Sequence, residues 1–349
     1  MHSSLPTQSI MKRPVTLLLL CLLALALPLP AQPEPPPIEL FRIGSGGAGG
    51  TYYPIAGLIA LAISNPPGSR DCSEGGSCGV PGLVAIAQAA NGSVANVMDI
   101  QKGILESGFS QSDVAHWAYT ASETFQGRAP MSKLRTIASL YPESIHLVAR
   151  RGSGIHSVYD LQGKRVALGE PGSGTLIDAE ILLRAYGLNK DQVNIEYAKF
   201  ELAAEKLRSG TLDAFFVVTG YPARTISELA RDSAIDLIPI DGPVSEQVIR
   251  DNPFFSRGAI PGDTYSGIAD TVSTINVQAQ WLTSSDLDDE LIYQITRTLW
   301  NENSQQLLDK GHRKGREIRL QSALKGLAVP LHPGAARFYR EQGITVGKP

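Results

Sequence analysis

Short apolar runs alternate with segments of helical periodicity along most of the chain, and a turn rich in Gly, Ser or Thr separates each run from the helix after it. Alternation of this kind predicts parallel sheets covered by helices. The predicted strands are residues 40–43, 83–89, 108–109, 164–168 and 213–218, and the helices that follow them end near Ile63, Glu106, Phe125, Tyr186 and Arg231.

The alternation stops near Ile240. A long strand is predicted over residues 272–282, and the remaining segments are mostly helical, over residues 287–303, 304–312 and 335–342. A chain that builds one α/β lobe, then a second, and then returns to the first would end in this way. We therefore predict two α/β lobes with a cleft between them and two interlobe crossovers, near residues 141–148 and 270–277. The predicted divisions are residues 38–143 for the first part of lobe 1, 144–270 for lobe 2, and 271–349 for the return to lobe 1.

The N-terminus has the pattern of an export signal. Lys12 and Arg13 precede an apolar run over residues 15–27, and the small residue Ala31 follows at a plausible cleavage point. Residues 1–31 are predicted to be a signal peptide, and residues 32–37 a Pro-rich spacer. The alternatives are an uncleaved anchor and a start at Met11. We expect the mature chain to be periplasmic.

Composition and charge narrow the function classes. The 349 residues have 43% hydrophobic and 19% charged content and a net charge of −3. This is ordinary globular composition. Because Lys and Arg are interspersed with Asp and Glu, no segment has the basic density that nucleic-acid binding requires.

Two cysteines flank a short Gly/Ser-rich loop. Cys72 and Cys78 are predicted to form a disulfide, as an oxidising compartment favours. The alternative is a metal site, but two thiols without a nearby His or third Cys make a poor zinc set. We predict no metal and no cofactor.

The loops between strands and helices carry the candidate chemistry. In open α/β sheets, ligands bind at the carboxyl ends of strands. Helix N-termini offer unpaired N–H groups and a positive dipole end, which suit a carboxylate or phosphate. Five such loops follow the predicted strands, at residues 44–51, 91–93, 111–113, 169–175 and 219–222. Two of them, residues 44–51 and 169–175, are Gly-rich. We predict that these two loops grip a ligand from opposite sides of the cleft.

Nucleotide and catalytic motifs do not fit these loops. A P-loop needs Lys before Ser or Thr, but Gly50 precedes Thr51. The first loop lacks the acidic residue that a dinucleotide site needs after a second strand. No nucleophile–base pair is evident, and Gly172-Ser173-Gly174 is not a nucleophile elbow. We predict a protein that is not an enzyme.

A family resemblance rests on seven motifs in order along the mature chain. They are GSGGAGGTYYP (44–54), NGSVAN (91–96), QSDV (111–114), LYPE (140–143), GEPGSGT (169–175), GYP (220–222) and ALKGLAVPLHPG (323–334). In these motifs the chain resembles the TAXI-type solute receptors of TRAP transporters. The resemblance implies a type II periplasmic binding protein fold and a membrane permease driven by an ion gradient as partner. It also implies a ligand such as glutamate, 2-oxoglutarate or a related dicarboxylate.

The resemblance places eleven residues in the cleft: Gly46, Gly47, Tyr52, Ser93, Asn96, Gln111, Ser112, Gly172, Ser173, Thr175 and Tyr221. Unlike the other TRAP receptor branch, which holds its carboxylate with an arginine, these five loops contain no Arg or Lys, although Arg224 lies nearby. The ligand is therefore expected to be a small anionic or zwitterionic solute held by neutral donors, on a monomer. The alternatives are a periplasmic ligand sensor on the same fold, and a periplasmic hydrolase.

Overall fold

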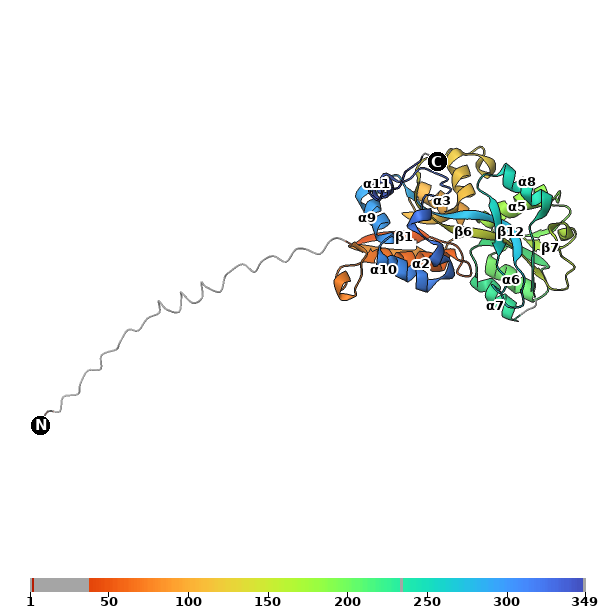
Figure 1. Ribbon diagram of the computed structural model, residues 1–349, viewed down its shortest axis with the longest axis horizontal. Coiled ribbons are helices and arrows are strands. Elements are labelled where there is room, and N and C mark those ends of the chain that lie inside the picture. Colours follow the sequence, from red (N-terminus) through yellow and green to blue (C-terminus); the bar gives the residue numbers. More distant parts are fainter. Residues whose placement is uncertain (1, 3–37, 233–234, 348–349) are drawn as a thin grey trace. The chain divides into compact units, whose positions relative to one another are not determined.

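A ten-stranded mixed sheet organises the computed structural model, with β4-β1-β5-β12-β6-β9-β7-β8 as the main strand order (Figure 1). The structure describes residues 2, 38–232 and 235–347. Residues 37–349 form one unit by their own contacts. The predicted spacer and, apart from His2, the predicted signal peptide lie outside the described residues. Within the described part of the chain, no helix has both the length and the hydropathy of a membrane span.

The first half of the sheet is built from parallel strands with their following helices. Burial alternates along β1, where Phe41 and Ile43 are fully buried, so one face of this strand packs on the core. The elements are β1 (Glu39–Gly44), α2 (Tyr52–Ile63), β4 (Leu83–Gln88), α3 (Ser93–Gln101), β5 (Ser107–Gln111) and α4 (Ser112–Thr120), with a two-stranded satellite of β2 (Ser64–Asn65) and β3 (Val80–Pro81).

The second half repeats this plan. Its strands β7, β8 and β9 are parallel to one another, and β10 and β11 add antiparallel pairs to β6 and β12. The elements are β7 (Arg165–Ala167), α5 (Gly174–Ala185), β8 (Asn194–Glu196), α6 (Phe200–Arg208), β9 (Ala214–Thr219), α7 (Arg224–Asp232), β10 (Ile235–Ile238), α8 (Gly242–Asp251) and β11 (Ser256–Ile260).

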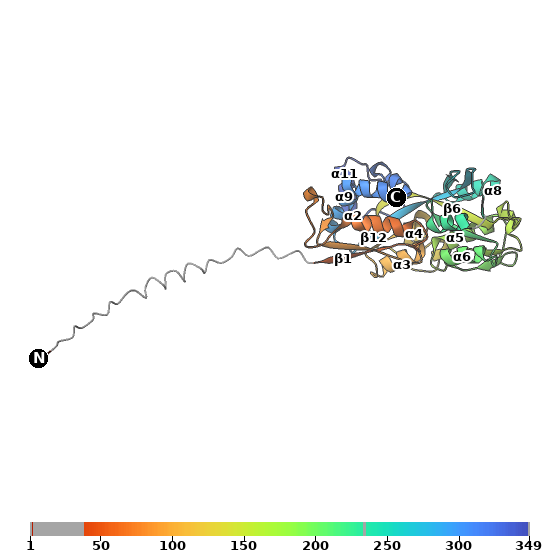
Figure 2. The ribbon, with the colours of Figure 1, turned by 90° about the horizontal axis from the view of Figure 1, so that it is seen from below.

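Two long antiparallel strands join the halves. β6 (Leu134–Arg150) pairs with β12 (Val272–Ser284) along much of its length and with β9 beyond Ser144, while β12 also pairs with β5. In Figures 1 and 2 both strands run from the elements of the first half to those of the second. The two crossovers predicted from sequence fall on β6 and on the start of β12. The exact lobe boundaries stay a prediction.

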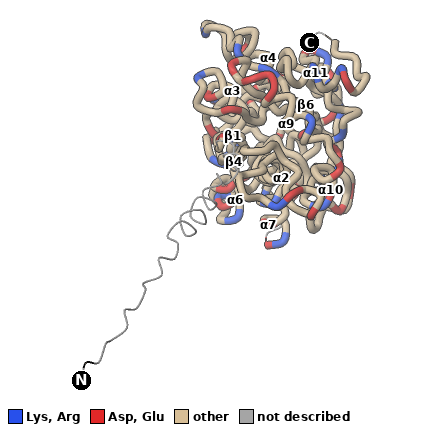
Figure 3. Tube along the Cα trace, turned by 90° about the vertical axis from the view of Figure 1, so that its left-hand side faces the viewer, with Lys and Arg blue, Asp and Glu red and all other residues tan. Residues whose placement is uncertain are grey.

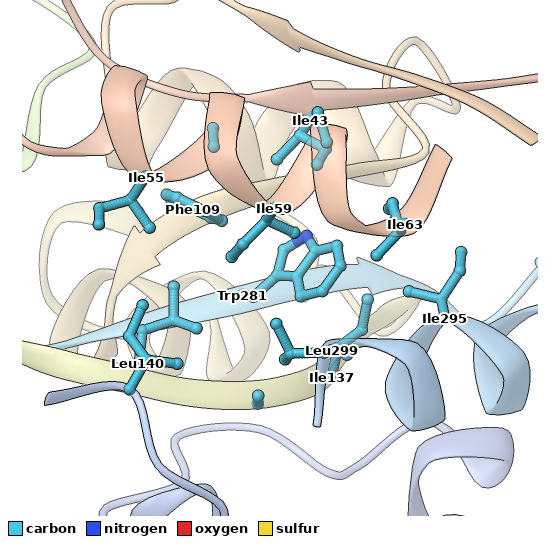
Figure 4. Close-up of a cluster of buried hydrophobic side chains, with 14 of the residues drawn as sticks. Ile43, Ile55, Ile59, Ile63, Phe109, Ile137, Leu140, Trp281, Ile295 and Leu299 are labelled. Atoms are coloured by element: carbon cyan, nitrogen blue, oxygen red, sulfur yellow. The ribbon is translucent and has the colours of Figure 1, made fainter. Parts of the chain in front are cut away.

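The three C-terminal helices, α9 (Asp289–Leu299), α10 (Glu302–Gly311) and α11 (Pro333–Glu341), belong to the first half, where α9 packs on α2 and on α11. Trp281 of β12 is fully buried, with Phe41 and Phe109 edge-on to it at ring-centroid distances of 6.4 and 6.5 Å. Figure 4 shows its indole between the isoleucines of α2 and Leu299 of α9. This core fixes the first half independently of the loops at the carboxyl ends of its strands.

Charged residues of both signs are interspersed along the elements visible in Figure 3. Ion pairs between neighbouring opposite charges are common at the surface, for example Arg257 with Glu246 and Arg337 with Glu290. Exposed pairs of this kind contribute little to stability.

The predicted disulfide is confirmed, because Cys72 and Cys78 are bonded across a six-residue separation. The bond closes a small loop beside β3. A loop this short restricts the unfolded chain modestly, so replacing both cysteines with Ser should lower the free energy of unfolding by about 2 kcal/mol. Denaturant unfolding of both proteins measures the difference. With reductant present the two proteins should unfold alike, and a difference that persists there would show that the thiols stabilise by packing.

Candidate functional site

The five loops that the sequence singles out converge on one cavity between the halves of the sheet. The centres of water-sized molecules can occupy about 90 Å³ of it, which is room for roughly six to nine waters. This volume suits a small solute. The lining residues are Gly46, Gly47, Gly50, Thr51, Tyr52, Asn91, Gly92, Ser93, Gln111, Glu143, Gly169, Glu170, Ser173, Gly174, Thr175, Ala198, Phe200, Glu201, Ala203, Phe216, Val217, Val218 and Thr219.

Seven of the eleven predicted site residues line this cavity: Gly46, Gly47, Tyr52, Ser93, Gln111, Ser173 and Thr175. They come from α2, α3, β5, α5 and the loops before these helices. Parallel strands bring their carboxyl ends to one edge of the sheet, which explains how loops far apart in sequence meet. Their roles toward a ligand stay predictions.

The other four, Asn96, Ser112, Gly172 and Tyr221, lie outside the lining. The Asn96 side chain donates hydrogen bonds to the carbonyls of Ser45 and Phe109, both at 2.8 Å, and so ties the first Gly-rich loop to β5. Ser112 is buried, and the Gly172 carbonyl accepts a hydrogen bond from the Ala95 N–H. The Tyr221 ring lies 3.9 Å from Lys314 Nζ. These contacts give Asn96, Gly172 and Tyr221 roles in shaping the loops, whereas the buried Ser112 hydroxyl has no hydrogen-bond partner among the described residues. Ligand contact by all four stays a prediction.

Direct hydrogen bonds join the halves across the cavity. The Gly49 N–H donates to Glu201 Oε1 at 2.8 Å, and the Thr51 N–H donates to Thr219 Oγ1 at 3.2 Å. Both Gly-rich loops line the cavity. The hydrogen bonds that each forms with the opposite half go to elements other than the opposing Gly-rich loop. The first loop contacts α6 and β9, and the second contacts the start of α3. The two halves therefore touch each other directly beside the cavity.

Two glycines allow this close approach. A Cβ at Gly49 would lie 1.9 Å from Thr225 Oγ1, and a Cβ at Gly174 would lie 1.3 Å from Gln111 Oε1. Both contacts run between the halves. Only a residue without a side chain fits at these positions, so glycine here serves contact between the halves.

The start of α5 supplies neutral donors. Ser173 caps this helix, since its hydroxyl accepts from the Leu176 N–H at 3.2 Å and donates to the Glu170 carbonyl at 2.7 Å. The N–H groups of Gly174 and Thr175 form no hydrogen bond with any described residue. Thr175 Oγ1 accepts from the Val218 N–H, which leaves its hydroxyl proton free to donate. These are the groups at which a solute acceptor can bind.

Three acidic residues that the sequence pattern does not predict as site residues also line the cavity: Glu143, Glu170 and Glu201. Burial raises the pKa of Glu143 to about 8, although Tyr52 donates a hydrogen bond to its Oε2 at 2.6 Å. Burial also raises the pKa of Glu170. The sequence contains one indication of a role for Glu143, because it lies in the extended run predicted near residues 141–148. A carboxylate buried in a strand costs free energy unless it is hydrogen-bonded or paired with a charge.

A buried carboxyl pair spans the halves beside the cavity. Asp113 of α4 and Asp178 of α5 are both fully buried. Gln111 Nε2 donates to Asp178 Oδ2 at 2.7 Å, and the Val114 N–H donates to Asp113 Oδ1 at 2.7 Å. The other oxygen of each, Asp113 Oδ2 and Asp178 Oδ1, has no hydrogen-bond partner among the described residues. Burial, together with the nearby Asp113 charge, holds the pKa of Asp178 well above its usual range.

Two α/β halves joined by two long strands, with a cavity at the carboxyl ends of the parallel strands, define the type II periplasmic binding protein fold, which confirms the predicted fold class. The chain matches the NMT1-like family over residues 43–343 and belongs to it. The TAXI subtype is a finer assignment and stays a prediction.

Solved structures with this fold include binding proteins captured with small molecules. MatC from Rhodopseudomonas palustris, with bound malate, aligns with a TM-score of 0.51 at 14% identity, over 87% of this chain and 99% of that one. PhnD1 from Prochlorococcus marinus, in complex with methylphosphonate, aligns with a TM-score of 0.50 at 10% identity, over 88% and 99%. At these identities the likeness shows the fold alone.

Proposed function

We propose that the protein is an extracytoplasmic receptor that captures a small carboxylate-bearing solute between two lobes and delivers it to a membrane permease. One observation carries the proposal: five loops from both halves enclose a single cavity, with free N–H and hydroxyl donors at the start of α5. Preorganised backbone donors at a helix N-terminus suit a carboxylate. The fold, shared with proteins solved with malate and methylphosphonate, supports the same reading.

The partner and compartment follow from the same proposal. Closure of two lobes around a solute changes the outer surface of both, which gives a permease a means to distinguish loaded from empty receptor. The permease type favoured by the sequence resemblance is a TRAP transporter, and the compartment is the periplasm. The cavity is lined by no evident nucleophile–base pair among its described residues, so the hydrolase alternative gains no support.

A thermal-shift screen of the mature protein tests the proposal, because a solute that binds only the folded state raises the melting temperature with concentration. Carboxylates, amino acids, phosphonates and neutral sugars form the panel. Stabilisation by one small solute at micromolar concentration is the expected result. Stabilisation by neutral sugars alone would contradict the carboxylate part of the proposal.

Replacing Thr175 with Ala should weaken binding of the solute found in that screen by about fivefold, the worth of one neutral hydrogen bond. Isothermal titration calorimetry measures the change. Thr120, an exposed threonine of α4, provides the control, because Thr120→Ala should leave affinity unchanged. If Thr175→Ala also binds like the parent, its hydroxyl serves only the Val218 N–H.

A further inference from the structure

The charged side chains that line the cavity are all acidic. Glu143, Glu170 and Glu201 belong to the lining, and no Lys or Arg is among the described residues that form it. Like charges that share a partly buried cavity repel more strongly than they do in bulk water. The described lining therefore offers no positive charge to balance these carboxyl groups.

The nearest cations are engaged outside the cavity. Lys314 Nζ lies 3.0 Å from Glu317 Oε1 and over the Tyr221 ring. Arg224, which the sequence places beside a loop, pairs with Glu228 at 2.7 Å and is 73% exposed. Neither offers its charge to the cavity.

Lys199 is the one cation that approaches a lining carboxylate. Its Nζ is 3.9 Å from Glu170 Oε2, but the lysine side chain is 68% exposed. An exposed pair at this distance is weak. Glu143 and Glu201 therefore form no ion pair with a cation among the described residues, although burial raises the pKa of Glu143 by more than Lys314 lowers it from a distance.

Glu143 has capacity to bind an occupant. It is 2% exposed, and Tyr52 donates to its Oε2. Its other oxygen, Oε1, forms no hydrogen bond with any residue that the structure describes. Because Glu143 belongs to the cavity lining, this oxygen is available to accept a hydrogen bond from a donor on the solute.

Glu201 lies against the first Gly-rich loop. Its Oε1 accepts the Gly49 N–H, and a Cβ built at Gly47 would lie only 2.9 Å from the same oxygen. This carboxylate and Glu143 thus line one cavity from α6 and from β6.

We propose that the solute carries an ammonium or guanidinium group that binds Glu143 and Glu201, and that its net charge is zero or positive. The proposal rests on the proposed receptor function and narrows its ligand class. A dicarboxylate would add two negative charges to a cavity with no lining cation. A carboxylate at the start of α5 fits only when the same solute brings its own cation.

Proton release provides a direct readout. In the empty cavity the pKa of Glu143 is about 8 because of burial, so the group is largely protonated at pH 7. The titratable and charged groups around it are Tyr52, Tyr141, Asp113 and Lys314. A bound cation favours the carboxylate and lowers this pKa, so binding at pH 7 should release a proton. An anion would raise the pKa and release none.

The main experiment screens matched solutes by thermal shift in the presence of EDTA. The panel contains the standard amino acids, diamines, guanidino compounds and dicarboxylates. A five-carbon set of cadaverine, 5-aminopentanoate and glutarate keeps size constant while charge changes. Stabilisers should all carry a cationic group, and calorimetry in two buffers should show proton release. Binding of a dicarboxylate without a cation overturns the inference and leaves the receptor function intact, whereas a panel without any stabiliser contradicts the receptor function itself.

Variants test the carboxylates directly. Glu201→Gln keeps an oxygen that accepts the Gly49 N–H and removes only the charge, so it should weaken binding of the cationic stabiliser by about tenfold or more. Glu205→Gln, one turn along α6 and exposed, is the matched control and should bind like the parent. Glu143→Gln, which keeps an acceptor for Tyr52, should also weaken binding and should abolish the proton release. Equal affinity in the parent, Glu201→Gln and Glu143→Gln overturns the proposal.

Discussion

Gly174→Ala should weaken solute binding by about tenfold to a hundredfold and leave both halves folded. The added methyl would lie 1.3 Å from Gln111 Oε1 and 2.5 Å from its Cδ, so the whole Gln111 side chain must move. That movement breaks its 2.7 Å hydrogen bond to Asp178 across the halves. A hydrogen bond of this kind contributes about 1.5–3 kcal/mol, and its loss disfavours the closed state to which a solute binds.

Calorimetric titration with the stabilising solute measures this loss. Gly57→Ala is the matched control, because Gly57 lies within α2 and a Cβ there has no neighbour within 4 Å. Alanine in a helix interior should stabilise slightly and leave affinity unchanged. If Gly174→Ala binds as tightly as Gly57→Ala, then Gln111 can leave its place at no cost and the contact does not control closure.

Much of the fold was predictable from periodicity alone. The strands around Phe41, Val84 and Phe215 and the helices that follow them were found, because short apolar runs and amphipathic segments alternate there. The elements missed were β8, α6, α8, β10 and β11. In β8 and β11 the strand is short or lies at the edge and keeps several exposed residues, so little apolar pattern marks it.

Three helices end several residues earlier than predicted. The helix expected to reach Glu106 ends at Gln101, the one expected to reach Phe125 ends at Thr120, and the one expected to reach Asn303 ends at Leu299. After Thr120, Ala121 takes a left-handed conformation with φ of 56°, and a separate helical turn contains Phe125. An apolar residue on the expected face extended the helical pattern across a turn that only local backbone geometry reveals.

The sequence predicts the loops of the site but not the acidic residues in its lining. Gly, Ser, Thr, Asn and Gln at strand ends mark the loops, and seven of the eleven predicted site residues line the cavity. Glu201 belongs to α6, which the sequence did not reveal, and its role depends on a contact to Gly49 that is 152 residues away. The absence of Arg and Lys from the loops was noted, but that observation alone did not indicate that carboxylates from β6 and α6 would face the same space.

The carboxyl pair of Asp113 and Asp178 also joins segments that no local pattern connects. Each residue belongs to the first two turns of a helix, in opposite halves, and both are without solvent contact. Separation of the halves would hydrate both carboxyls and favour their ionisation, whereas burial in contact with the opposite half disfavours a charge on either and raises the pKa of both. Closure is therefore linked to proton uptake, with the same sign as the burial of Glu143.

This linkage predicts that the free energy of unfolding falls as pH rises from roughly 4, where unfolded carboxyls ionise, until the raised pKa values of the folded pair are passed. Over that range the folded state holds protons that the unfolded chain has lost, so each pH unit costs about 1.4 kcal/mol per carboxyl that stays protonated. Asp178→Asn removes one such group, and its amide can still accept from Gln111. Its stability should therefore depend less on pH, with the largest gain over the parent at alkaline pH.

Denaturant unfolding between pH 5 and pH 9 measures the slope, and Asp191→Asn, at an exposed aspartate, should follow the parent. A residual decline is expected in Asp178→Asn because Glu143 still titrates with a raised pKa. Identical slopes in the parent and Asp178→Asn would show that Asp178 does not titrate with a raised pKa in the folded protein. A smaller slope in Asp178→Asn would show that a proton held by Asp178 in the folded protein accounts for part of the decline of stability with pH.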